Sequence, residues 1–247
     1  MRFETKTGID HVPSRFVLSE TQAGYFTGMN DPNPAVAQLY SDSYTYLNRV
    51  FNNRTNWNVV NEPPSPDPQW AGIDWNGDTM QSRDVILEGD QCLVFFLGGF
   101  SGDGFSNSPN PALPGGNRFG PFFDFRTSRL VDPGRAASPG YRVYIDAYGK
   151  SPYVYFSSYK VRNGYARYAA LGSDCSLIPD GPYQDGNGNY WNRDSFQIIS
   201  AGRDTEFGPG GTWSLADPAK IAPAGKDDMT NFAEKPLGVS QRLRSGS

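Results

Sequence analysis

Glycine and proline occur so often in this sequence that few long helices can form. The chain has 28 glycines and 20 prolines among its 247 residues, and its mean hydropathy is −0.57. Proline breaks the interior of a helix, and glycine weakens it. Hydrophobic residues still make up 37% of the chain and aromatic residues 14%, which is enough for a core. The composition therefore predicts β-structure with many long turns instead of a helical bundle.

Local patterns place a helix early in the chain and strands late. Asn33 is a good helix N-cap with Pro34 at the first helical position, so we expect a helix from Pro34 to about Phe51. Residues 141–146 and 152–156 alternate around a glycine-containing turn, which is typical of an antiparallel hairpin. The apolar run 92–97 is core, but its six residues fit a buried strand or a short helix equally well.

The stretch 196–232 carries the strongest chemical signal. An apolar strand, Phe196–Ile199, leads into a glycine-rich loop, and the chain then returns to an acidic pair. Calcium takes six to eight oxygens from carboxylates, amides and backbone carbonyls, and glycines let a loop turn its carbonyls inward. We expect one Ca²⁺ here, with ligands from the side chains of Asp204, Asp227, Asp228 and Asn231 and from carbonyls near Ala201 and Phe207. The alternative is an ordinary solvated turn, in which Asp and Asn bond their own backbone.

Charge and residue counts narrow the classes of function. The net charge is −4 and there is no basic run, so nucleic acid is not an expected partner. The one histidine, His11, lies in a polar stretch and is expected at the surface, which argues against a Ser-His-Asp hydrolase or a histidine zinc site. The acidic segment 74–78 is expected to be an Asx turn more than a second cation site.

The two cysteines, Cys92 and Cys175, leave two alternatives open. A disulfide between them would suit an extracytoplasmic protein. Two buried free thiols fit as well, because cysteine also packs as a small hydrophobic residue. Neither belongs to a CxxC pair, so structural zinc is not expected.

Two motifs in the C-terminal part resemble one family when they are taken in order. The first is Asp146-Ala-Tyr-Gly-Lys-Ser-Pro-Tyr-Val-Tyr155, and the second is Ser200-Ala-Gly-Arg-Asp-Thr-Glu-Phe-Gly208 followed by Asp227-Asp-Met-Thr-Asn231. They resemble the C-terminal part of the major pseudopilins of type II secretion systems and related type IV pilin-like proteins. The segment 87–99 is similar to the long planctomycete-type variants of that family. The resemblance covers roughly residues 87–99 and 141–232.

The chain departs from the family pattern at several points. Ala147-Tyr148 stands where the family has Pro-Trp, Thr205 stands where it has glycine, and the loop before Asp227 is longer. The family's G-F-T-L-x-E processing site and long hydrophobic helix do not occur in this sequence. Contact with a membrane is therefore expected only through an N-terminal helix that this chain lacks.

The resemblance implies an α+β fold, in which an N-terminal helical segment packs on an antiparallel β-sheet with long loops and a calcium-stapled C-terminal loop. We expect a single pilin-like domain over residues 1–247, with an N-terminal helical region (1–60), a variable insertion-rich region (61–140) and a β-hairpin, strand and metal-loop region (141–247). The implied function is structural and not enzymatic: the head of a pilin-like subunit, outside the cytoplasmic membrane, that assembles with other pilin-like subunits.

Two other functions remain as alternatives. A secreted module that binds carbohydrate or a surface polymer would use exposed tryptophans as a stacking platform; the five candidates are Trp57, Trp70, Trp75, Trp191 and Trp213. A hydrolase with paired carboxylates would combine Asp90 with Asp124 or Asp146.

Overall fold

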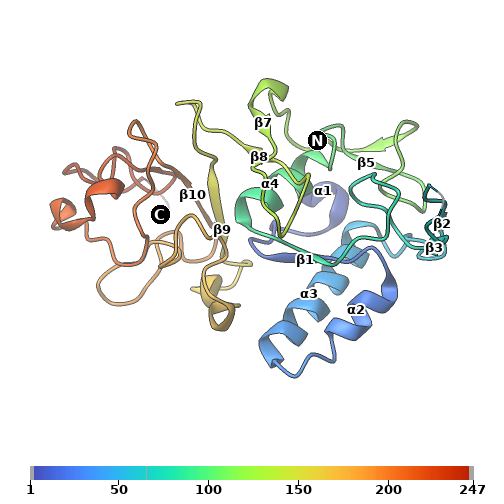
Figure 1. Ribbon diagram of the computed structural model, residues 1–247. Coiled ribbons are helices and arrows are strands. Elements are labelled where there is room, and N and C mark those ends of the chain that lie inside the picture. The colour runs from blue at the N-terminus through green and yellow to red at the C-terminus, as the bar shows by residue number, and fades with distance from the viewer. Residues whose placement is uncertain (1–2, 65, 245–247) are drawn as a thin grey trace.

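The computed structural model describes residues 3–64 and 66–244, and the fold is a mixture of helices and small antiparallel sheets (Figure 1). The α-helices are α1 (Phe3–Thr7), α2 (Gln22–Gly28), α3 (Pro34–Val50) and α4 (Gly89–Gly98). The strands are β1 (Phe16–Leu18), β2 (Val60–Asn61), β3 (Trp70–Ala71), β4 (Val85–Leu87), β5 (Phe105–Ser106), β6 (Arg118–Phe119), β7 (Leu130–Val131), β8 (Val143–Tyr144), β9 (Val154–Ser157), β10 (Phe196–Ser200) and β11 (Met229–Thr230). Short 3₁₀ turns are η1 (Thr127–Arg129), η2 (Gly164–Ala166), η3 (Ala169–Leu171), η4 (Pro218–Lys220) and η5 (Pro223–Gly225). The α+β class expected from the sequence is confirmed.

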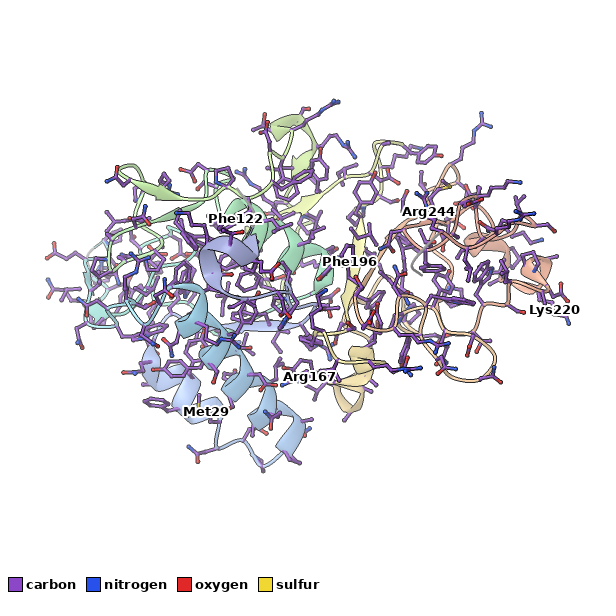
Figure 2. The ribbon with its side chains drawn as sticks, turned by 180° about the vertical axis from the view of Figure 1, so that it is seen from behind. Met29, Phe122, Arg167, Phe196, Lys220 and Arg244 are labelled. Carbon is purple, nitrogen blue, oxygen red and sulfur yellow. The ribbon has the colours of Figure 1, made fainter. Side chains whose placement is uncertain are left out.

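The antiparallel sheet β11–β10–β9 is the wall between two hydrophobic cores. Successive side chains of a strand point to opposite faces. On β9, Tyr155 packs into the core of the N-terminal half, whereas Val154 and Phe156 pack into the core of the C-terminal half. Figure 1 shows this sheet between the blue-to-green half and the orange-to-red half, and in the view from behind Phe196 lies at their boundary (Figure 2). The predicted strand Phe196–Ile199 is confirmed as β10.

The helix predicted from Pro34 forms as α3. Asn33 caps it by accepting a hydrogen bond from the backbone N–H of Ala35 at 3.0 Å, and Pro34 occupies the first turn. This helix packs on β1, which pairs with β4. The larger sheet is covered instead by α4, which contacts β9. The N-terminal helix thus packs on an antiparallel sheet, but on the small β1–β4 sheet, while the apolar run 92–97 supplies the helix that covers the larger one.

The run 92–97 belongs to α4, so the helical alternative is the one that the structure shows. The helix begins against the main sheet: the Gly89 N–H donates to the Asp174 carbonyl at 3.0 Å, and a Cβ at Gly89 would lie 1.8 Å from the Tyr155 carbonyl oxygen. The close approach of α4 to β9 thus depends on the absence of a side chain at Gly89.

We expect the substitution Gly89→Ala to lower the free energy of unfolding by about 2–3 kcal/mol, because the added methyl group must push α4 away from the backbone of β9. Urea unfolding followed by tryptophan fluorescence measures the loss. Gly186→Ala is the control, since a Cβ there meets nothing within 4 Å. Equal stability of the two variants would contradict the close packing of α4.

The predicted hairpin between residues 141–146 and 152–156 forms only near its turn. Ile145 bridges Pro152, and the N–H of Tyr153 donates to the Tyr144 carbonyl at 2.9 Å. Beyond that point β8 pairs with β7, and β9 pairs with β10. Pro152 has no N–H to donate, which limits the ladder at the turn.

Both cysteines are buried as free thiols. Of the two alternatives left by the sequence, the structure therefore has unpaired Cys92 and Cys175. Within residues 3–64 and 66–244, every helix is too short or too polar to cross a lipid bilayer.

Candidate functional site

The acidic loop that follows β10 folds back on the segment before β11. Gly202 has a φ of +71°, and a Cβ on it would lie 2.2 Å from the carbonyl oxygen of Asp227. Gly208 also lies close to the return segment, because its Cβ would lie 2.8 Å from the Cα of Gly225. Two glycines thus allow the loop 201–208 to lie directly against residues 225–228, as the sequence predicted.

Asp228 is the centre of this arrangement, and its side chain has no access to solvent. Its Oδ2 accepts hydrogen bonds from the Tyr183 hydroxyl at 2.8 Å and from the Gly208 N–H at 3.1 Å. Its Oδ1 is buried and has no hydrogen-bond partner in the described part of the chain. A buried carboxylate with an unpaired oxygen is costly unless a proton or a cation neutralises it.

The electrostatics of Asp228 follow from this burial. Burial raises the pKa of Asp228 to about 7, and the negative charges of Asp227 and Asp204 add to the rise. The hydrogen bonds from Tyr183 and Gly208 oppose it. A carboxylate in this condition gains more than an exposed one from a bound cation.

Asp227 and Asp204 lie on the same loop, but each also binds backbone amides. Asp227 Oδ2 accepts from the N–H groups of Arg203 at 2.5 Å and Asp204 at 2.9 Å. Asp204 is exposed, and its Oδ1 accepts from the Glu206 N–H at 2.9 Å. Among the described residues, the oxygens of Asp204, Asp227 and Asp228 do not form a group within 4.8 Å of one another. The three side chains lie in one region of the loop, but their carboxylate oxygens do not converge on a single point.

Asn231 has a different place from the one expected. Its Oδ1 accepts from the Ile198 N–H at 3.0 Å, and its Nδ2 donates to the Phe196 carbonyl at 3.0 Å. The side chain therefore continues the pairing of β11 with β10 and faces away from the acidic loop. Because Asn231 directly follows an edge strand, its side chain can hydrogen-bond to the backbone of the neighbouring strand. The spacing of the motif does not reveal this role.

The donor set nevertheless suits a hard cation. Asp228 Oδ1 has no partner, and the carbonyl oxygens of Ala201 and Phe207 accept no hydrogen bond from a described residue. Asp227 and Asp204 each accept hydrogen bonds from backbone amides through one carboxylate oxygen, which leaves the other oxygen for a cation. Carboxylate and carbonyl oxygens, supplemented by water, are the ligands that Ca²⁺ takes.

The two motifs quoted for the resemblance contact each other. The Ser200 hydroxyl donates to Asp146 Oδ2 at 2.6 Å, and the Ser151 hydroxyl donates to the Thr205 carbonyl at 2.8 Å. Asp146 is buried, and its Oδ1 accepts from the N–H of Tyr148 at 3.0 Å in the hairpin turn. The hairpin turn therefore supports the beginning of the acidic loop.

Tyr183 is a residue of this site that the sequence did not single out. It is fully buried in the C-terminal core and reaches Asp228 across 45 positions of sequence. No local pattern marks it, because its partner is brought near only by the folding of loops.

Two other groups place three acidic or thiol side chains within 4.8 Å in the described chain. Glu20, Asp74 and Asp78 form the first, and Glu88, Asp90 and Cys175 form the second. In the first group Asp74 accepts from the N–H groups of Gly77 and Thr79, as in the expected Asx turn. In the second group Asp90 is held by both Nη atoms of Arg135. Backbone amides and an arginine already engage these carboxylates.

The residues of the two alternative functions lie in structural positions. Trp70, Trp75 and Trp213 are buried, while Trp57 packs on Tyr25 and Trp191 on Phe232, so the five rings form no exposed stacking platform. For the hydrolase pair, Asp90 binds Arg135 and Asp146 binds the hairpin turn. Asp124 is exposed.

Comparison with known proteins gives no match: no family model, no curated protein and no solved structure is similar to this chain. The motifs and the geometry of the acidic loop are therefore the features that bear on function.

Proposed function

We propose that this chain is the globular head of a pilin-like structural subunit whose C-terminal loop is fixed by a calcium ion. The observation that carries the proposal is the buried, unpartnered Oδ1 of Asp228 at the point where the acidic loop meets the return segment. Asp228, Asp227 and Asp204 would hold the ion together with the carbonyls near Ala201 and Phe207. Asn231 is left out of this set because its amide binds β10.

The role of the ion would be structural. The regular structure of the loop 201–228 is limited to two short 3₁₀ turns, η4 and η5, so ordering its backbone costs conformational entropy. A cation that binds only the folded loop stabilises it by mass action. A rigid loop of this kind suits a head that packs against other pilin-like subunits outside the cytoplasmic membrane.

We expect calcium to raise the thermal midpoint of the chelator-treated protein by about 5–10 °C. A hundredfold excess over the dissociation constant corresponds to about 2.7 kcal/mol, and each kcal/mol shifts the midpoint of a chain of this size by about 2–4 °C. Differential scanning fluorimetry in EGTA and in CaCl₂ measures the shift. The substitution Asp228→Asn should remove it.

The matched control is Asp78→Asn, which alters the separate group of Glu20, Asp74 and Asp78 and should keep the calcium response. If Asp78→Asn removes the response and Asp228→Asn does not, the ion belongs to Glu20, Asp74 and Asp78. A melting curve that neither calcium nor chelator changes would rule out the calcium staple.

Assembly is tested separately in cells that express the native protein. An antibody against this chain should label filaments that are sheared from the cell surface. Label confined to the cytoplasm would contradict the pilin-like role, whatever the calcium experiment shows.

A further inference from the structure

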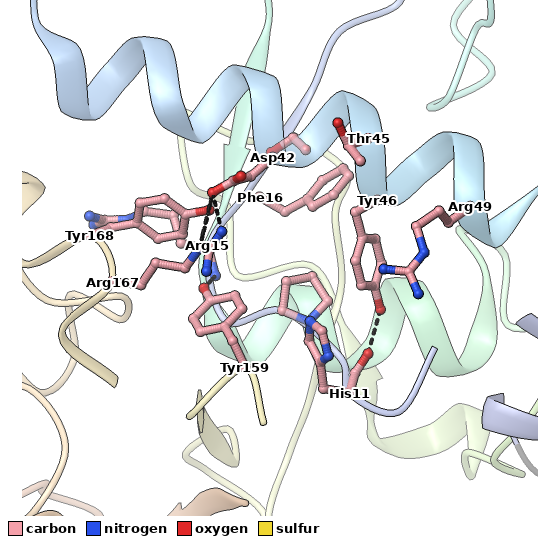
Figure 3. Close-up of a pocket in the computed structure, with 12 residues that line it drawn as sticks. His11, Arg15, Phe16, Asp42, Thr45, Tyr46, Arg49, Tyr159, Arg167 and Tyr168 are labelled. Atoms are coloured by element: carbon pink, nitrogen blue, oxygen red, sulfur yellow. Dashed lines mark hydrogen bonds and ion pairs between the residues drawn. The ribbon is translucent and has the colours of Figure 1, made fainter. Parts of the chain in front are cut away.

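A cationic pocket that shares no residue with the acidic loop is shown in close-up in Figure 3. It is bounded by α3, by the segment that leads into β1, and by the segment that follows β9. Its volume is about 160 Å³, and its charged lining consists of His11, Arg15, Asp42, Arg49 and Arg167. The tyrosines Tyr46, Tyr159 and Tyr168 supply ring surface.

The lining is positive although the chain as a whole has a net charge of −4. Three arginines face one lining carboxylate, Asp42. Two further carboxylates lie behind the lining: Asp10 is 3.0 Å from His11 Nδ1, and Asp174 is 3.6 Å from Arg15 Nε. The sequence shows no basic run because the three arginines come from three distant segments that only the fold brings together.

The arginines differ in how far they are engaged. The Nη atoms of Arg15 donate to the carbonyls of Gly172 and Ser173, but its Nε is buried without a hydrogen bond. Arg167 donates to Asp42 through Nε and Nη2. Arg49 makes no side-chain hydrogen bond or ion pair with the described residues. Arg49 therefore keeps all of its N–H groups for a ligand, whereas Arg15 and Arg167 keep only those that their carbonyl and carboxylate partners leave.

The positive potential acts on His11 as well. Burial lowers the pKa of His11, the charges of Arg167 and Arg49 lower it further, and the bond to Asp10 opposes both effects. An anion bound in the pocket would relieve this repulsion. Figure 3 shows Arg49 beside Tyr46 at one end of the pocket and Arg15 and Arg167 beside Asp42 at the other.

We propose that this pocket binds a phosphate-type or sulfate-type oxyanion, free or as the ester group of a carbohydrate. Guanidinium groups suit such ligands because their planar donors match two oxygens at once. Arg15 and Arg167 are paired with Asp174 and Asp42, so Arg49 supplies the positive charge of the lining that no described carboxylate pairs. The Arg167 guanidinium lies over the rings of Tyr159 and Tyr168, 5.4 and 5.8 Å from their centroids, so these rings help to position it. This inference is independent of the calcium loop.

The test is isothermal titration calorimetry at constant ionic strength with inorganic phosphate, sulfate, glucose 6-phosphate and acetate. We expect saturable binding of phosphate and sulfate, and binding of acetate at least about tenfold weaker. The substitution Arg49→Ala should weaken phosphate binding at least about tenfold, the effect of losing a charge-assisted hydrogen bond, while the thermal midpoint stays unchanged. Arg162→Ala is the matched control, since Arg162 is exposed on the segment after β9 and does not line the pocket.

The calorimetry distinguishes the two sources of the anion and can also overturn the proposal. Tighter binding of glucose 6-phosphate than of phosphate would identify an esterified sugar as the source of the anion, and equal binding would identify the free oxyanion. Absence of saturable binding, equal effects of Arg49→Ala and Arg162→Ala, or acetate binding as tight as phosphate would overturn the proposal.

Discussion

The substitution Arg135→Met should lower the free energy of unfolding by about 3–5 kcal/mol, the loss expected when one member of a buried ion pair is removed. Arg135 donates through both Nη atoms to the two oxygens of Asp90, at 2.8 and 2.6 Å, and Asp90 is fully buried at the first turn of α4. Without Arg135 the carboxylate stays buried and unneutralised. Equilibrium unfolding in urea at pH 7 measures the effect.

The pH and a double variant distinguish this mechanism from lost packing. Burial raises the pKa of Asp90, and Arg135 opposes that rise, so the loss in Arg135→Met should be smaller at pH 5, where Asp90 can take up a proton. The double variant Asp90→Asn with Arg135→Met should recover part of the stability. Arg126→Met, at an exposed arginine, should be neutral within about 0.5 kcal/mol. A loss that is independent of pH and persists in the double variant would contradict the electrostatic account.

The sequence predicted best those elements whose signals are local. The cap of α3 lies in Asn33 and Pro34 themselves, and the apolar run of β10 is bounded by turns on both sides. The run that became α4 could not be assigned from its six apolar residues alone, and the local signal for a helix was the capping box of Glu88 and Gln91 just before it. The pairing of β8 with β7 instead of β9 has a different origin: the choice between strands is made by tertiary contacts.

For the candidate site, the sequence located the loop but not all of its contacts. Glycines and aspartates mark a loop that packs closely, and Gly202 does lie against Asp227 while Gly208 lies against Asp228. The same residue types also bind backbone amides, so the role of Asn231 could not be predicted without knowing that its strand pairs with β10. His11, expected at the surface, is largely buried in the cationic pocket because distant arginines and tyrosines surround it.

In chelator, the stability of the protein should fall as the pH rises from about 4 to about 7. The pKa of Asp228 is about 7 in the fold, against 3.8 for an ordinary aspartate. The folded state therefore holds a proton over this range that the unfolded state has released, and its advantage disappears once the pH passes the folded pKa. The full effect is about 4 kcal/mol, of which about 3 kcal/mol lies between pH 5 and pH 8.

The measurement is urea unfolding at pH 5 and pH 8, with and without calcium, in the wild type and in Asp228→Asn. Burial also raises the pKa of Glu20 to about 7 and the pKa values of Asp90 and Asp174, so the wild-type slope contains further contributions and the difference between the two proteins is the test. Asp228→Asn should flatten the slope by about 3 kcal/mol over this range. Calcium should also flatten the slope of the wild type, because at pH 8 the cation takes the place of the proton on the buried carboxylate and so raises the stability there. Identical slopes in the two proteins would mean that Asp228 Oδ1 is neutralised by neither a proton nor an ion, and the calcium staple would lose its physical basis.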